Sequence, residues 1–153
     1  MPDDANNDLS DLYQEVILDH NRNPRNFRVP PDANRKAEGD NPLCGDHFTV
    51  FLKLDNDVIA DVGFQGAGCA ISKASASLMT EAIKGKTVAE AQKYFAGFQQ
   101  MLATGHADED AMGGLCALGG VHKFPMRVKC AVLSWHAMLA GLRGQPLVST
   151  EKP

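Results

Sequence analysis

Apolar and polar residues alternate in two neighbouring stretches in the first half of the chain. Every second position is apolar in residues 47–54, and the same alternation returns in residues 58–64. A period of two places the apolar side chains on one face of an extended strand. Because the sequence between the two stretches, Asp55-Asn56-Asp57, is typical of a turn, the pattern predicts a β-hairpin.

Helical spacing is found on both sides of this hairpin. Three segments carry apolar residues at intervals of three and four positions, which is the spacing of one helical face: residues 9–17, 71–83 and 88–103. Pro24 should end the first helix, and Gly85 suits the left-handed residue that closes the second. Thr87 and Glu90 have the spacing of a capping box, which predicts the start of the third helix.

Composition guides the interpretation of the remaining segments. Residues 125–142 are apolar on most sides and have Pro125 in the first turn, so they predict a helix buried between two layers. Residues 104–120 are acidic and rich in glycine, which predicts a loose insert with one short helix at most. Residues 34–40 are polar and leave open an edge strand that leads into the next turn.

Together these elements predict one α+β domain, in which helices pack on a small antiparallel β-sheet. The domain is expected to cover residues 9–142. A flexible acidic tail, residues 1–8, precedes it, and a C-terminal tail, residues 143–153, follows.

Bulk properties exclude several classes of protein. A chain of 153 residues is long enough for one domain with its own core. The net charge of −4 gives no general attraction to nucleic acid or to anionic membranes, and no apolar run reaches the roughly 18 residues of a membrane span. The N-terminal sequence is acidic where a secretory signal is basic and apolar, so a cytoplasmic protein is expected. In that reducing compartment, four cysteines favour metal binding or reactivity over disulfides.

A set of candidate metal ligands follows from the predicted hairpin. Cys44 and Asp46 lie in the turn before its first strand, and Cys69 lies in a glycine-rich loop after its second strand. Antiparallel pairing brings these two outer ends together. Cys130 is placed near the start of the last helix, so three thiols and one carboxylate offer the four ligands that zinc accepts in a tetrahedral site.

The charges of this set suggest how it is balanced and used. Four anionic ligands exceed the charge of a divalent ion, and Arg127 and Lys129, which flank Cys130, offer compensation. A hard carboxylate oxygen among soft sulfurs suits a site whose ligands are meant to be rearranged, whereas a structural zinc more often has a fourth thiol or a histidine.

Alternatives to this ligand set stay open. Taken singly, each of these cysteines is more often a packed core residue than a ligand. Cys116, in the insert, is interpreted as a bystander, and the alternative is a cysteine-only site in which it displaces Asp46. His47 is a weaker candidate because it directly follows Asp46 in the sequence.

The same residues occur in motifs that resemble a known family. The segments EVILDHNRNPRN, NPLCGDHF, FQGAGCAISKASASLMTEAIKGK and KFPMRVKCAVLSWHAM closely resemble the SufU branch of the IscU/NifU-N family of iron-sulfur assembly proteins. The resemblance extends from Leu9 to about Leu142. Two features favour this branch over IscU-type scaffolds, namely the longer spacer before the last cysteine and Lys129, where those scaffolds carry a histidine.

This resemblance implies an IscU-like fold with a zinc ion held by Cys44, Asp46, Cys69 and Cys130. It further implies that the protein accepts sulfur from the persulfide of a SufS-type cysteine desulfurase. Cys44 would be the acceptor thiol, released when a histidine of the desulfurase replaces it on zinc, and Arg127 would orient or neutralise the site. Downstream SUF scaffold proteins are further possible partners. The resemblance leaves open whether the chain is itself an enzyme or a carrier that stimulates one.

Two other functions remain open from the sequence. One is a scaffold that assembles a transient [2Fe-2S] cluster on the same three thiols, which thiolate ligation permits and which Lys129 in place of histidine makes less favourable. The other is a domain in which zinc has only a structural role. A zinc deaminase or protease is poorly supported, because neither H-x-E with P-C-x-x-C nor HExxH occurs in the chain.

Overall fold

A four-stranded sheet forms one layer of the molecule. The structure is a computed structural model that describes residues 14–43, 45–106, 108–144 and 147–149. The strands are β1 (Arg35–Asn41), β2 (Asp46–Asp55), β3 (Val58–Ala67) and β4 (Leu147–Ser149), in the spatial order β3-β2-β1-β4. β1, β2 and β3 pair antiparallel, and the short β4 runs parallel to β1.

The predicted hairpin is confirmed by β2 and β3. Its turn contains Asn56 with a φ of 55°, a left-handed conformation that asparagine tolerates better than most residues. The alternation in the sequence corresponds to burial, since Phe48, Val50 and Leu52 of β2 are fully buried. These side chains face the helices, and the sheet thereby forms one wall of the core.

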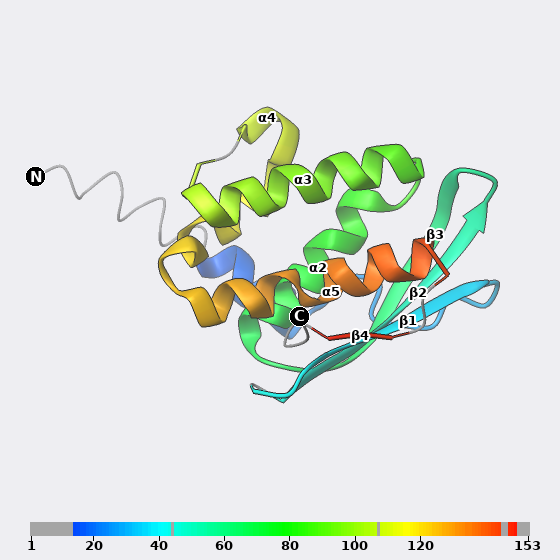
Figure 1. The fold of residues 1–153 in the computed structure, drawn as a ribbon, viewed down its shortest axis with the longest axis horizontal. Coiled ribbons are helices and arrows are strands. Elements are labelled where there is room, and N and C mark those ends of the chain that lie inside the picture. Colours follow the sequence, from blue (N-terminus) through cyan, green and yellow to red (C-terminus); the bar gives the residue numbers. More distant parts are fainter. Residues whose placement is uncertain (1–13, 44, 107, 145–146, 150–153) are drawn as a thin grey trace, which may run out of the picture.

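Helices α2 (Ala70–Ile83), α3 (Val88–Thr104) and α5 (Pro125–Leu142) confirm the predicted helical segments. An earlier helical segment, residues 14–22, ends before Pro24 as expected. α5 lies against β1 and β2, α2 packs beside it, and α3 lies beyond them (Figure 1). Thr87 and Glu90 form the capping box at the start of α3, and Gly85 follows α2 with a φ of 82°.

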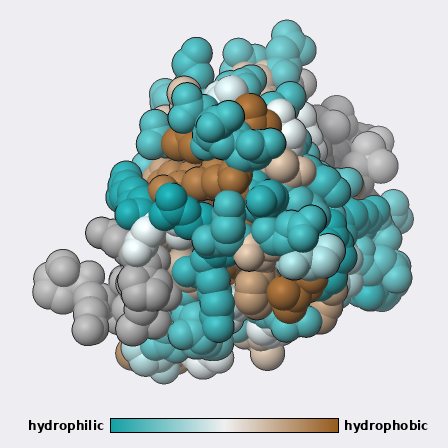
Figure 2. Space-filling view, turned by 90° about the vertical axis from the view of Figure 1, so that its right-hand side faces the viewer, coloured by the Kyte–Doolittle hydropathy of each residue, from teal (hydrophilic) through white to brown (hydrophobic). Residues whose placement is uncertain are grey.

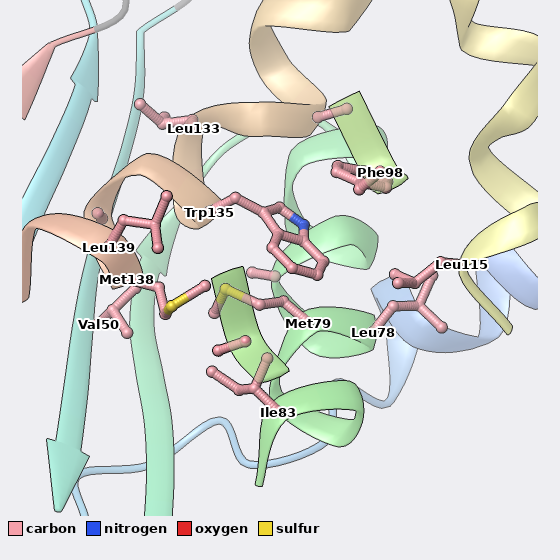
Figure 3. Close-up of a cluster of buried hydrophobic side chains, with 14 of the residues drawn as sticks. Val50, Leu78, Met79, Ile83, Phe98, Leu115, Leu133, Trp135, Met138 and Leu139 are labelled. Atoms are coloured by element: carbon pink, nitrogen blue, oxygen red, sulfur yellow. The ribbon is translucent and has the colours of Figure 1, made fainter. Parts of the chain in front are cut away.

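Trp135 occupies the centre of the helical layer. It is fully buried in α5 and points towards Phe98 of α3 and Met79 of α2 (Figure 3), with its ring stacked on Phe98 at a centroid distance of 4.8 Å. Its indole N–H donates to Ser75 Oγ, and the Ser75 hydroxyl donates to the carbonyl of Ala131. Ser75 therefore joins α2 to α5 by hydrogen bonds inside the core.

The region expected to be a loose insert is ordered and packed, so this prediction was wrong. It contains α4 (Glu109–Met112) and η1 (Gly113–Lys123), a 3₁₀-helix of 11 residues. Leu115, Leu118 and Val121 of η1 are buried in the core. Their spacing of three residues matches the period of a 3₁₀-helix, in which side chains three apart lie above one another.

The position of β1 also differs from the expectation of an edge strand. The segment does form a strand, but it lies between β2 and β4. β4 comes from residues assigned to the C-terminal tail, and it pairs with β1 in the register Gly39 to Val148. Three residues are too few to give a periodic pattern, so this pairing left no signal in the sequence.

Figure 2 shows one face on which hydrophilic residues predominate around separate apolar areas. Large apolar side chains that are more than two-fifths exposed include Leu43, Phe124, Met126 and Val29. Within the described residues, the helices are all too short or too polar to cross a membrane.

Candidate metal centre

The turn between β1 and β2 contains the first candidate ligands. The N–H of Gly45 donates to the Asn41 carbonyl over 2.8 Å, and the N–H of Leu43 donates to Asn41 Oδ1 over 3.2 Å. Gly45 has a φ of 75°, which favours glycine. Cys44 belongs to this turn but lies outside the described residues. Asp46 follows at the first position of β2 and is 2% exposed.

Two glycines allow the loop between β3 and α2 to approach this turn. His47 pairs with Ala67 across the hairpin, so loop and turn lie at the same end of it. A Cβ at Gly66, whose φ is 139°, would lie 2.2 Å from the carbonyl oxygen of His47, and a Cβ at Gly68 would lie 2.9 Å from Asp46 Oδ1. The close approach therefore requires glycine at both positions.

Cys69 is the N-cap of α2. Its Sγ accepts a hydrogen bond from the N–H of Ser72 over 3.4 Å, and its own N–H donates to Asp46 Oδ1 over 3.0 Å. The thiol lies 3.8 Å from Asp46 Oδ2. Asp46, at the start of β2, and Cys69, just after β3, thus hold each other in place at the same end of the hairpin.

The third candidate ligand comes from α5. Pro125 occupies the first turn of this helix, as predicted, and Cys130 lies in the next turn and is 3% exposed. The ligand atoms of Asp46, Cys69 and Cys130 all lie within 4.8 Å of one another. Packing of α5 on the sheet thus brings together three residues that are far apart in the sequence.

These donors fit a zinc ion. With usual bond lengths, neighbouring ligand atoms of a tetrahedral zinc site are roughly 3.5–3.8 Å apart. Asp46 Oδ2 and Cys69 Sγ have this separation already, at 3.8 Å. All three ligand atoms lie within 4.8 Å of one another, so small movements of the side chains would bring them to the distances of a zinc site. Two sulfurs and one oxygen leave one position of a tetrahedron for a further ligand.

A hollow of about 340 Å³ opens over the cluster and makes it accessible. Its lining comprises Gly45, Asp46, Ala67, Gly68, Cys69, Met126, Arg127 and Cys130. Arg127 is exposed at this hollow, where its positive charge offsets that of the anionic ligands. Lys129, the second predicted cation, is partly buried and does not line the hollow.

The other candidates from the sequence lie elsewhere. Within the described part of the chain, the cluster of Asp46, Cys69 and Cys130 is the one group of three or more potential ligands. Cys116 belongs to η1 and is not a member. His47 is exposed and lies 3.5 Å from Glu38 and 3.7 Å from Asp40, because alternation along β2 turns it away from the face of Asp46.

Two residues near the centre were not singled out from the sequence. Ser72 supplies the N–H that bonds to the Cys69 sulfur, and Met126 lines the hollow. Ser72 stands three residues after the N-cap, which is the usual distance of a capping donor. That spacing was a usable signal, whereas the place of Met126 depends on how α5 is docked.

Comparison with known proteins assigns most of the chain to one family. The family described as NifU-like N terminal domain matches residues 12–131. The chain is 45% identical over 138 residues to the zinc-dependent sulfurtransferase SufU of Bacillus subtilis (strain 168), which covers 90% of this chain and 93% of that protein.

Scaffold proteins and a solved structure are similar as well. Identity is 36% over 136 residues with the iron-sulfur cluster assembly scaffold protein IscU of Streptococcus pyogenes serotype M1, covering 88% of this chain and 85% of that one. The crystal structure of FiSufU from Fervidobacterium islandicum AW-1 aligns with a TM-score of 0.79 and 37% identity, covering 84% of this chain and 94% of the other. The IscU-like fold expected from the sequence is therefore confirmed.

Proposed function

This chain belongs to the NifU-like N-terminal domain family of iron-sulfur assembly proteins, and we propose that it is a zinc-dependent acceptor of persulfide sulfur from a SufS-type cysteine desulfurase. The observation that carries the proposal is the convergence of Asp46, Cys69 and Cys130 at the floor of an open hollow. The similarity to a protein named zinc-dependent sulfurtransferase supports it independently. We place this activity in the cytoplasm, where thiols stay reduced.

In this proposal Asp46, Cys69 and Cys130 hold zinc together with Cys44. A bound zinc ion keeps its thiolate ligands deprotonated at neutral pH and shields them from solvent. Cys44 would be the member suited to leave, because its neighbours in the sequence, Leu43 and Gly45, are exposed, whereas Cys69 caps a helix and Cys130 is buried within one. Asp46, Cys69 and Cys130 would remain to hold the ion, and a histidine of the desulfurase would replace Cys44.

The transfer itself is a thiol-persulfide exchange. The Cys44 thiolate attacks the outer sulfur of the desulfurase persulfide, forming a new S–S bond. The S–S bond within the desulfurase persulfide breaks, and its electron pair leaves with the desulfurase cysteine as a thiolate. Cys44 then carries the persulfide, with no net oxidation or reduction. Arg127, at the edge of the hollow, would stabilise the negative charge during the exchange.

The rim of the hollow suits a protein partner. Leu43 and Phe124 are 66% and 59% exposed beside the Cys44 turn and at the start of α5, and Met126 lines the hollow. Exposed Phe and Met side chains are typical of the part of a surface that becomes the core of a protein interface. A docked desulfurase would cover them and exclude water from the exchange, and the persulfide would then pass to a downstream SUF scaffold protein.

The alternative is a scaffold that assembles a [2Fe-2S] cluster on the same thiols, and the names of the IscU relatives favour it. Lys129, next to Cys130, argues against it, since the IscU-type scaffolds that the sequence resembles carry a histidine there. Anaerobic reconstitution separates the two. A stable cluster that reaches an apo-acceptor faster than the zinc protein delivers sulfur would favour the scaffold.

The direct test is the alanine output of the cognate desulfurase. Adding the zinc-loaded protein should raise the rate, and Cys44→Ala should abolish the gain because no acceptor thiol remains. Cys116→Ser serves as the matched control and should keep the full gain. Persulfide mapped on Cys44 by mass spectrometry would complete the case, whereas a gain that survives Cys44→Ala would refute the proposal.

A further inference from the structure

Two buried polar groups next to the ligand cluster have no hydrogen-bond partner. Among the residues that the structure describes, the side-chain atoms in this condition are Asn41 Nδ2 and Ser134 Oγ. Asn41 is fully buried and Ser134 is 1% exposed. Proteins rarely bury a donor without a partner, so each instance calls for a physical reason. Both atoms lie close in the fold to candidate ligands.

Asn41 reaches the cluster from the sheet. It pairs with Asp46 across β1 and β2, and residues paired in this way direct their side chains to the same face. Its Oδ1 already accepts the N–H of Leu43, which fixes the amide and leaves the two hydrogens of Nδ2 without an acceptor. The amide donor therefore lies beside Asp46 on the buried side of the turn that contains position 44.

Ser134 reaches the cluster from α5. It follows Cys130 by four residues, and side chains at this spacing lie on one helical face, with the later one leaning towards the earlier. This part of α5 also approaches the end of β1. A Cβ at Gly141 would lie 3.7 Å from Ala37, and a Cβ at Gly39 would lie 3.2 Å from Ala137. Continuing this register places Asn41 opposite the turns that carry Cys130 and Ser134.

We infer that Asn41 and Ser134 are positioning residues of the metal centre, which donate hydrogen bonds to its ligands from their buried side. Neither donor reaches a ligand atom in this structure. Once zinc has drawn its ligands together, the Ser134 hydroxyl would donate to the Cys130 sulfur and the Asn41 amide to a ligand atom near Asp46. The metal-bound set carries more negative charge than the ion neutralises, so these donors find strong acceptors there. Without zinc the same donors would stay buried without a bond and would disfavour folding.

This inference rests on the metal centre of the proposed function but does not depend on sulfur transfer. It predicts that removing a donor weakens zinc binding but does not destabilise the zinc-free protein. Removing either donor should weaken zinc binding roughly 10- to 100-fold, the usual effect of losing such a partner of a ligand. The same change should leave the zinc-free protein as stable as before or more stable, because an unsatisfied buried group is removed. A residue with a purely structural role would not produce this combination.

The experiment compares Asn41→Ser, Ser134→Ala and Ser77→Ala in the full chain. Serine at position 41 retains an oxygen for the Leu43 N–H but lacks the amide donor. Ser77 is the matched control, a buried serine of α2 whose hydroxyl already bonds to His20 and to the N–H of Arg25. Zinc affinity is measured by competition with a chromophoric chelator, and the stability of the zinc-free protein by thermal unfolding.

Asn41→Ser and Ser134→Ala should lose zinc affinity, and their zinc-free forms should unfold at a temperature no lower than that of the wild type. Ser77→Ala should keep its zinc affinity, and its zinc-free form should unfold at a lower temperature. In the cobalt-substituted protein, Ser134→Ala should move the thiolate-to-cobalt charge-transfer band to lower energy, since the sulfur loses a hydrogen bond. Unchanged zinc affinity in both variants would overturn the inference alone. A wild-type protein that binds no zinc would instead overturn the proposed function. If one variant fails to fold, the other still decides the matter.

Discussion

The two ends of the β2–β3 hairpin satisfy their backbone groups in different ways. At the turn end, backbone bonds to backbone: the N–H of Ile59 donates to Lys86, and that of Val88 donates to Asp57. At the ligand end, the N–H groups of Cys69 and Ser72 are accepted by Asp46 and by the Cys69 sulfur. The candidate ligands are therefore also structural supports, so local structure and metal binding are coupled at one end and independent at the other.

Removing one carboxylate charge at each end should give the largest contrast. Asp46→Asn keeps the shape and the acceptor for Cys69 but replaces an anionic ligand by a neutral amide. Zinc affinity should fall by at least about 100-fold. That is the upper end of the loss expected when a residue that only hydrogen-bonds to a ligand is removed, and Asp46 is itself a candidate ligand. Asp57→Asn, in the exposed turn, should bind zinc as the wild type does. Chelator competition measures both, and similar affinities for the two variants would remove the distinction between the ends.

Alanine in place of a left-handed glycine should give a smaller contrast. Gly66 and Gly85 both have positive φ, but an added Cβ contacts the His47 carbonyl at Gly66 and meets no atom within 4 Å at Gly85. Gly85→Ala should cost about 1–2 kcal/mol of unfolding free energy, from the backbone alone. Gly66→Ala adds the clash and should cost about 3 kcal/mol or more. Urea unfolding of the zinc-free protein measures both, and equal losses would mean that the loop is not held tightly against β2.

The two helix caps offer the smallest contrast. Thr87→Ala removes the capping box of α3 and should cost about 1 kcal/mol without affecting zinc. Cys69→Ser replaces one cap of α2 by another, so the zinc-free protein should keep its stability within about 0.5 kcal/mol while zinc binding is lost. Thermal unfolding with and without zinc tests both variants. Zinc binding retained by Cys69→Ser would exclude Cys69 as a ligand.

Local patterns were enough to predict most of the fold. The hairpin, the capping box at Thr87 and the limits of α5 each depend on residues that are near one another in sequence. Residues 113–123 were misjudged because their apolar residues recur at intervals of three, and their glycine pairs suggested a loop. β4 depends on a pairing with a strand more than one hundred residues earlier, which no local pattern records.

The candidate site was predictable as far as hairpin geometry reaches. Antiparallel pairing indicated that the turn of Cys44 and the loop of Cys69 lie together, and the structure places Asp46 beside Cys69. The approach of Cys130 depends on how α5 docks on the sheet, and its candidacy came from residue type and helix position. Asn41 and Ser134 gave no signal, because their burial arises only when β1 and α5 pack together.

The hydrogen bonds of Ser75 limit how the centre can open. This side chain joins Ala131 and Trp135 of one helix to the helix that Cys69 caps, within the buried core. Parting the two helices to release sulfur would break both bonds and expose the largest aromatic ring of the core. In the proposed zinc centre, Cys69 and Cys130 would therefore be the fixed ligands, and exchange of a ligand would fall to the turn before β2, where it requires a change of a few backbone torsions and leaves the core intact.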